Sequence, residues 1–151
     1  MRKLSLLLII SLAAVPLLAQ KSGSSQNTET QIRDMLQQQA AAWNRHDLEA
    51  VMAAYWNSPK LTFFSGATAT TGWAATLERY RQRYQSSGAD MGKLDFSELV
   101  VEQLGPDSAF VRGHWHLTMP DGKEPHGLFT LILRKLPEGW RIIHDHSSGV
   151  N

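Results

Sequence analysis

The chain has 151 residues, of which 42% are hydrophobic and 19% charged, a size and composition typical of one globular domain with its own core. Its formal net charge is only +1, so no nucleic acid or other polyanionic partner is indicated. The chain contains no cysteine, which excludes disulfides, thiolate metal sites, a cysteine nucleophile and a lipoprotein anchor.

Residues 1–19 are typical of a secretory signal peptide. The charged start Met1-Arg2-Lys3 precedes an apolar run over 4–18, and Ala19 supplies a small residue for cleavage. The apolar run is too short to span a bilayer, so we expect a periplasmic or secreted protein with no stable membrane anchor after cleavage. Cleavage would leave 13 basic against 14 acidic residues, a formal charge of −1.

Residues 20–28 are polar and serine-rich without a hydrophobic period, which predicts a flexible tether before a domain spanning 29–151. Apolar residues then recur at helical spacing from Ile32 to Trp43 and again from Leu48 to Trp56. We expect two helices joined by a short turn, with Asp47 as the N-cap of the second helix.

A short strand is predicted over residues 61–65 and a third helix from Trp73 to about Ser86. We expect the arginines of this helix to lie in solvent: Arg79, Arg81 and Arg83. Turns rich in Gly and Pro then separate four strand-like runs, at 96–104, 109–119, 127–136 and 140–148. Helices first and an antiparallel meander afterwards predict an α+β fold.

The order of these elements resembles the nuclear transport factor 2-like superfamily. The stretch AAAWNRHDLEAVMAAY is similar to the first-helix signature of SnoaL-like and ketosteroid isomerase-like members. LTFFSG, TGW, GHWHLT and GWRIIHDHSS resemble a bacterial branch of uncharacterised function. The resemblance covers about residues 30–148 and implies a cone, with three N-terminal helices against a strongly curved antiparallel sheet. Members include isomerases, dehydratases and non-catalytic domains, so it implies a place for a site but no single reaction.

The resemblance also allows catalytic positions to be compared. Alignment with the ketosteroid isomerase signature places its Tyr at Gln39, its Asp base near Ser65 and its protonated Asp at Thr130. None of the three is retained, so the resemblance implies that this chain cannot run that reaction in the same way. It does imply that these positions face the cavity.

Strand alternation, with tight turns assumed at 120–125 and 136–139, predicts which side chains of the last three strands share a face. The cavity face is predicted to carry Trp115, Thr130, Asp145 and Ser147. The opposite face is predicted to carry His114, His116, Phe129, Leu131, His144 and His146. A Ser-His-Asp triad within 144–147 is therefore not expected, because alternate residues cannot converge on one substrate atom.

Asp145 is the best-placed acid. Burial among aromatic rings is expected to raise its pKa, which suits a proton carrier, although a structural, hydrogen-bonded Asp remains the alternative. Aromatic and polar residues are expected to line a pocket for a hydrophobic small molecule, with core filling as the alternative for the aromatic rings. This expected ligand-binding set is Gln39, Trp43, Tyr55, Phe63, Ser65, Trp73, Tyr80, Trp115, Thr130 and Ser147.

Two classes of function stay open at this point. One is an exported isomerase or lyase that acts on a small apolar carbonyl compound without a cofactor and uses Asp145 as proton carrier. The other is a non-catalytic ligand-binding or oligomerisation domain.

The four strand histidines form two His-x-His pairs about 9 to 10 Å apart by strand spacing, too far for one closed ion site, so no metal is expected. We expect this outer sheet face to form a homodimer, which weakens as the imidazoles protonate between about pH 7 and 5.

Overall fold

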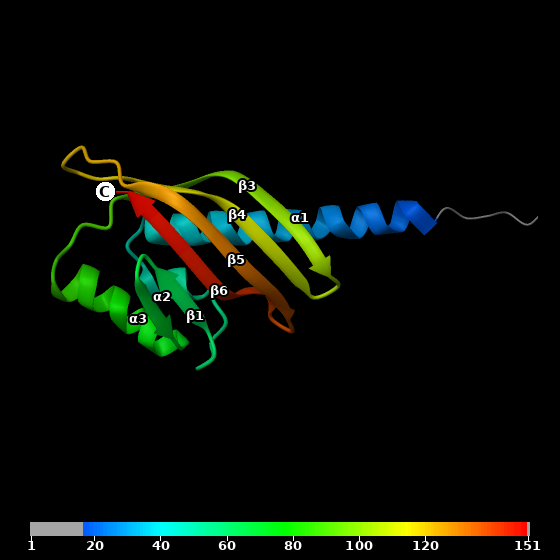
Figure 1. Ribbon diagram of the computed structural model, residues 1–151, viewed down its shortest axis with the longest axis horizontal. Helices are drawn as coiled ribbons and strands as arrows, with labels where there is room; N and C mark the ends of the chain where they lie inside the picture. Colours follow the sequence, from blue (N-terminus) through cyan, green and yellow to red (C-terminus); the bar gives the residue numbers. More distant parts are fainter. Residues whose placement is uncertain (1–16, 151) are drawn as a thin grey trace, which may run out of the picture.

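The computed structural model describes residues 17–150 (Figure 1). Most of the expected signal peptide therefore lies outside the described residues. Three helices come first, α1 (Leu17–Trp43), α2 (Leu48–Met52) and α3 (Trp73–Arg81), and α3 continues into a π-helical turn over Gln82–Ser86. In the part of the chain described, no helix is long and apolar enough to cross a membrane.

Helix α1 includes residues 20–28, where the sequence predicts a flexible tether, and the structure differs from the prediction here. Side chains four residues apart support the helix around this point. Gln31 donates to Asn27 at 2.8 Å, and Arg33 donates to Glu29 at 2.8 Å. Such pairs can stabilise a solvated helix that has no hydrophobic period. The sequence-based prediction relied on that period, which residues 20–28 lack.

The turn between α1 and α2 is as predicted. Asp47 caps α2, and its carboxylate accepts a hydrogen bond from the backbone N–H of Ala50 at 3.0 Å. Trp43 ends α1 and Leu48 begins α2, so the reversal brings the buried sides of both helices to the same core.

The strands form one six-stranded sheet in the order β2-β1-β6-β5-β4-β3. Their bounds are β1 (Thr62–Ser65), β2 (Thr68–Thr71), β3 (Lys93–Gly105), β4 (Ser108–Thr118), β5 (His126–Leu136) and β6 (Gly139–Val150). The sheet is mixed and not wholly antiparallel as predicted, because β1 pairs in parallel with the final strand, β6. Strand β2 has no counterpart among the sequence-based predictions.

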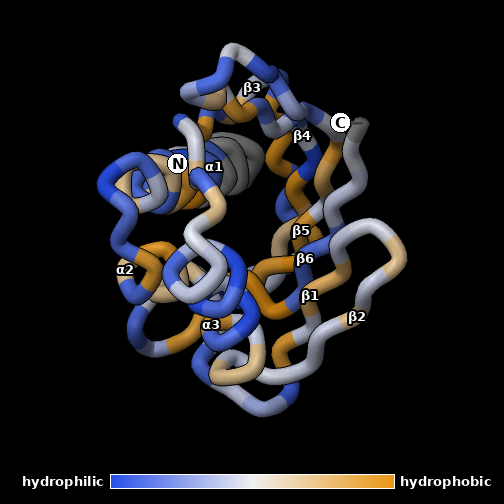
Figure 2. The backbone as a smooth tube through the Cα atoms, turned by 90° about the vertical axis from the view of Figure 1, so that its left-hand side faces the viewer, coloured by the Kyte–Doolittle hydropathy of each residue, from blue (hydrophilic) through white to orange (hydrophobic). Residues whose placement is uncertain are grey.

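The helices cover one face of the sheet, and apolar segments of both layers face each other between them (Figure 2). The largest fully buried side chains come from both layers: Ile32, Leu36, Leu48, Met52, Leu61, Val111, Leu133 and Ile142. Removing such side chains from water is the main favourable contribution to folding. The α+β prediction is confirmed, and the cone has one curved sheet around a helical layer.

Strand β5 is turned over relative to the prediction. Trp115 pairs with Gly127, and Asp145 pairs with Leu131, instead of both sharing a row with Thr130. On both sides of β5, the observed register differs from the predicted register by an odd number of residues. Such a difference exchanges the two faces of a strand. Leu131 therefore faces the helices together with Phe129, and Thr130 faces outward beside its partner His146, so the predicted facing of these three β5 residues is wrong.

Candidate functional site

A cavity of about 520 Å³ lies between the helices and the inner face of the sheet. Its walls come from all three helices, the segments that follow α2 and α3, and all six strands. The residues expected to form the site that line this cavity are Gln39, Trp43, Tyr55, Phe63, Ser65, Tyr80, Trp115, Asp145 and Ser147.

Two residues of the expected set lie elsewhere. Trp73 begins α3, and its indole N–H donates to the backbone oxygen of Met52 at 2.9 Å, which holds the ring against α2 and away from the cavity lining. Thr130 is on the outer face because β5 is turned over. The prediction that Trp73 and Thr130 belong to the cavity wall is therefore wrong.

Asp145 is the buried carboxyl group of the cavity. Its residue is only 7% exposed, and its Oδ2 accepts a hydrogen bond from the hydroxyl of Tyr55 at 2.6 Å. Its other oxygen, Oδ1, is buried without a hydrogen-bond partner in the described residues. A buried polar atom without a partner is costly, so a donor that reached Oδ1 would gain a hydrogen bond there, although the atom is covered in this structure.

Burial raises the pKa of Asp145 from 3.8 to about 7, and the hydrogen bond from Tyr55 partly offsets this rise. Burial, followed by the nearby charge of Asp145, raises the pKa values of Tyr55 and Tyr80 well above the ordinary value for a phenol. Both hydroxyls therefore remain protonated near neutral pH, whereas Asp145 is present in both its charged and its neutral form.

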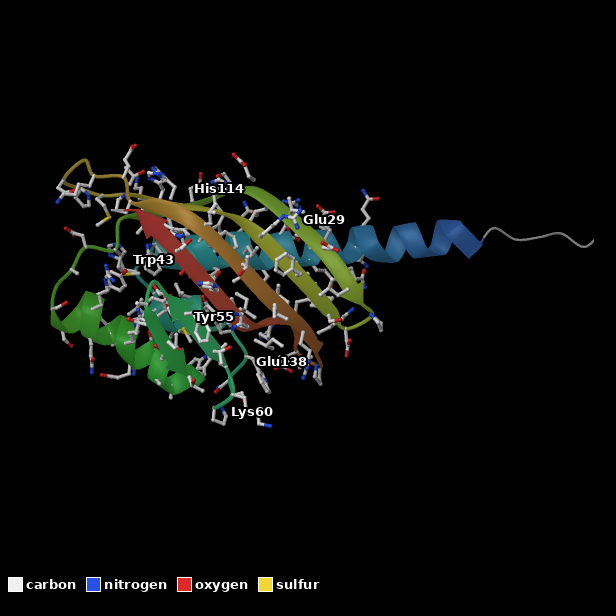
Figure 3. All side chains as sticks on the ribbon, viewed as in Figure 1. Glu29, Trp43, Tyr55, Lys60, His114 and Glu138 are labelled. Carbon is white, nitrogen blue, oxygen red and sulfur yellow. The ribbon has the colours of Figure 1, made fainter. Side chains whose placement is uncertain are left out.

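Aromatic rings form much of the cavity wall. Trp43 at the end of α1 and Tyr55 after α2 both lie on the helix side of the sheet (Figure 3). Trp43 meets Tyr80 and Tyr84 edge to face, with ring centroids 5.9 and 5.2 Å apart, and Phe63 lies 5.7 Å from Tyr80. Edge-to-face pairs of this kind hold the rings in fixed orientations and give the wall a defined shape.

Trp115 closes the side of the cavity next to β6. Its indole N–H donates to the backbone oxygen of Ser148 at 2.9 Å. A Cβ atom at Gly149 would lie 2.4 Å from the Trp115 ring, so only glycine lets the ring approach the strand this closely. Strand β6 thus carries Asp145 and, through the backbone at Ser148 and Gly149, also holds the Trp115 ring in place.

Among the cavity residues that the sequence analysis missed are two cations. Arg79 and Arg83 line the cavity, although both were expected to lie in solvent. Arg79 and Arg83 are four residues apart, and so are their neighbours Tyr80 and Tyr84. This helical spacing could have indicated that the two arginines share one side of the helix. Arg81 points elsewhere and pairs with Glu49.

The outer face carries the histidines, as predicted, so the residues 144–147 divide between two faces and form no catalytic triad. The His144 ring meets the Thr62 hydroxyl at 2.6 Å and the Phe64 ring edge to face at 5.1 Å. His114 lies 3.5 Å from the carboxylate of Glu98. Over the described range, no three His, Asp or Glu side chains gather as a candidate metal site.

Comparison with known proteins gives one family match. The family described as SnoaL-like domain matches residues 32–151. None of the curated proteins matches the chain.

Many solved structures share the fold. A nuclear transport factor 2-like protein of unknown function from Shewanella oneidensis MR-1 is 35% identical with a TM-score of 0.74, over 80% of this chain and 98% of its own. Two proteins from Novosphingobium aromaticivorans are provisionally described as a scytalone dehydratase and an aromatic ring hydroxylase. The first is 11% identical with a TM-score of 0.71, over 86% of this chain and 89% of its own. The second is 17% identical with a TM-score of 0.69, over 83% and 90%. At these identities both show likeness of fold alone.

Proposed function

Since the chain belongs to the SnoaL-like family of the nuclear transport factor 2-like superfamily, we propose that it is an exported isomerase or lyase for a small, mostly apolar carbonyl compound. Asp145 is its proton carrier. The observation that carries this proposal is a buried carboxyl group with one unpartnered oxygen, Oδ1, on a residue that lines an aromatic-walled cavity of about 520 Å³. Cavities of this size are typical of sites for small organic molecules.

The chemistry requires a group that both accepts and returns a proton. The ionised form of Asp145 takes a proton from the carbon next to the substrate carbonyl, and the electron pair of that C–H bond moves to the carbonyl oxygen. As the carbonyl re-forms, the electron pair moves back from the oxygen, and the neutral form returns the proton in one of two ways. In a substrate with an adjacent C=C bond the proton goes to the far carbon of that bond, which is an isomerisation; in a substrate with a hydroxyl on the β carbon it goes to that hydroxyl, which leaves as water. A pKa of about 7 makes both forms available near neutral pH.

Tyr55 orients the carboxyl group in this proposal. Its hydroxyl donates to Oδ2 at 2.6 Å, which leaves Oδ1 for the substrate. Tyr80 and Ser147 line the same cavity and supply hydroxyl groups for the substrate oxygen.

One observation favours the second candidate, a non-catalytic ligand-binding domain. The Tyr55 hydroxyl, which touches the acid, already donates to that carboxylate and is not free for a substrate oxygen. An enzyme of this type needs donors aimed at the developing oxyanion. Binding and turnover must therefore be tested separately.

For the binding part, we expect Trp115→Ala to weaken the binding of N-phenyl-1-naphthylamine, a neutral fluorescent probe, by about tenfold, which corresponds to about 1.4 kcal/mol of lost contact. Titration monitored by probe fluorescence measures the change. Thr130→Val is the matched control, because Thr130 lies on β5 but outside the cavity. Unchanged affinity in a folded Trp115→Ala protein, or an equal loss in Thr130→Val, would contradict the proposed cavity.

The outer sheet face is proposed to bind a second copy of this chain. Phe64, Leu128 and Ile132 are 37%, 56% and 40% exposed there, close to the rings of His144 and His146. Such a face suits association with an identical apolar face. At the far side of this face, two imidazoles lie beside carboxylates, His114 3.5 Å from Glu98 and His116 3.8 Å from Glu124.

We expect the dimer to dissociate as the pH falls below about 6, because protonated imidazoles on facing sheets repel each other. Burial and the neighbouring His146 hold the pKa of His144 below its ordinary value, so this ring gains its proton at a lower pH than an ordinary imidazole does. Sedimentation velocity from about pH 7.5 to 5 measures the change. Leu128→Asp should be monomeric throughout, and a wild-type monomer at every pH would rule out this interface.

A further inference from the structure

We propose that the molecule held by the cavity is an organic anion, whose carboxylate binds Arg79 and Arg83 while its apolar part lies among the aromatic rings. This inference rests on the proposed function, since it names the chemical class of the ligand for the same cavity. It begins from two cationic side chains that line a largely aromatic cavity.

Both guanidinium groups are held by aromatic rings. The Cζ atom of Arg79 lies 5.4 Å from the centre of the Phe63 ring, and that of Arg83 lies 5.4 Å from the centre of the Tyr84 ring. Stacking of this kind fixes the plane of a guanidinium group and leaves its N–H edge free. Arg79 uses one N–H group to bind the Thr70 hydroxyl at 3.1 Å, which limits its movement further.

Neither of these two cations pairs with a carboxylate of the described chain. Asp90 also lines the cavity but forms no ion pair with either arginine. Arg81, on the same helix, differs in pairing with Glu49. A carboxylate is the group that guanidinium N–H forks bind best, through two parallel hydrogen bonds.

The arginines and the acid lie along the same aromatic wall. Arg79 stacks on Phe63, and Phe63 pairs with Asp145 across β1 and β6, while Arg83 stacks on Tyr84. Burial raises the pKa of Tyr80, and the charges of Asp145 and Arg79 act on it in opposite directions. A ligand whose carboxylate binds the arginines would therefore lie along this wall, with another part of the molecule near Asp145.

The test uses two probes of the same shape, 2-naphthoate and its neutral amide, 2-naphthamide. In titration calorimetry we expect the wild-type protein to bind 2-naphthoate about tenfold more tightly than 2-naphthamide, because charge-assisted hydrogen bonds are roughly twice as strong as neutral ones. The double variant Arg79→Met, Arg83→Met should lose this preference and bind 2-naphthamide with nearly unchanged affinity.

Two further variants keep the test decisive. Arg81→Met removes a cation of the same helix that does not line the cavity, so it should retain the preference for 2-naphthoate. Arg83→Met alone spares the Arg79 to Thr70 hydrogen bond and serves if the double variant fails to fold. It should still reduce the preference by about threefold.

Equal binding of the two probes by the wild-type protein would overturn this inference and leave the proposed function standing. An equal loss in Arg81→Met would overturn it as well, because the effect would then reflect only net charge. If neither naphthalene probe nor N-phenyl-1-naphthylamine binds, the inference and the proposed cavity function both fail.

Discussion

Replacing Asp145 with Asn is expected to reduce deuterium incorporation next to the carbonyl group of 1-tetralone by about a hundredfold or more, the usual loss when a general base is removed. Asn has nearly the same size and can still accept the Tyr55 hydrogen bond, but it cannot take up a proton. Binding of N-phenyl-1-naphthylamine should change by less than about threefold, since the probe is neutral and its one N–H group can donate to an amide oxygen as well as to a carboxylate. Proton NMR in deuterated buffer follows the exchange.

Tyr55→Phe is the matched control for this experiment. It keeps the carboxylate but removes the hydrogen bond that lowers the pKa of Asp145, so the exchange rate should reach its half-maximal value at a higher pH than in the wild-type protein. Exchange at an undiminished rate in Asp145→Asn would eliminate Asp145 as proton carrier. Probe binding without any exchange in the wild-type protein would favour the non-catalytic alternative.

Asp145 is also expected to make the protein less stable as the pH rises. Its pKa is about 7 in the folded protein, and the ordinary value of 3.8 applies to the unfolded chain. The folded state therefore binds the proton more tightly than the unfolded state does. Its stabilising contribution is therefore fully present below about pH 4 and is lost as the pH rises through about 7. At about 1.4 kcal/mol per pH unit, the loss amounts to roughly 4 kcal/mol at most.

Urea unfolding of the wild-type and Asp145→Asn proteins from pH 4 to 8.5 isolates this contribution. The unpartnered amide hydrogens of Asn destabilise the variant by an amount that does not depend on pH. We therefore expect the free energy of unfolding of Asp145→Asn, relative to the wild-type protein, to increase by up to about 4 kcal/mol between about pH 4 and 8. A constant difference over this range would mean that Asp145 titrates as an ordinary carboxylate.

Most of the fold could be predicted from the sequence, because each element has a clear local signal. Helical spacing and the Asp47 cap predicted α1 and α2, and the Gly- and Pro-containing turns predicted the last four strands. The segment 20–28 lacks such a signal, since its helix depends on polar pairs and on continuity with the packed part of α1. The parallel partner of β1 could not be predicted because pairing between distant segments leaves no local pattern.

The candidate site could be predicted only in part, and β5 shows why. Strands β4 and β6 alternate between inward and outward residues clearly enough to place Trp115 and Asp145. In β5 both faces are apolar, since Phe129 is buried while Leu128 and Ile132 are exposed. Alternation therefore could not choose between two registers that differ by one residue, and the wrong register put Thr130 in the cavity.

The two ends of α3 illustrate a different limit. Trp73 looks like a cavity residue by type, but a hydrogen bond to the backbone of Met52 holds it elsewhere. Arg79 and Arg83 look like solvent-facing residues by type, but the rings of Phe63 and Tyr84 hold them at the cavity. Specific side-chain contacts determine all three positions, and residue type alone does not reveal them.

The titration of Asp145 itself is the most direct measurement, because both the proposed reaction and the stability effect depend on this buried carboxyl group. Carbon-13 NMR of protein labelled at the aspartate carboxyl carbons follows each group separately, and the signal missing in Asp145→Asn identifies the one of interest. We expect that signal to titrate at about 7, and at a higher pH in Tyr55→Phe. A midpoint near the ordinary 3.8 would contradict the assignment of Asp145 as the proton carrier of the cavity.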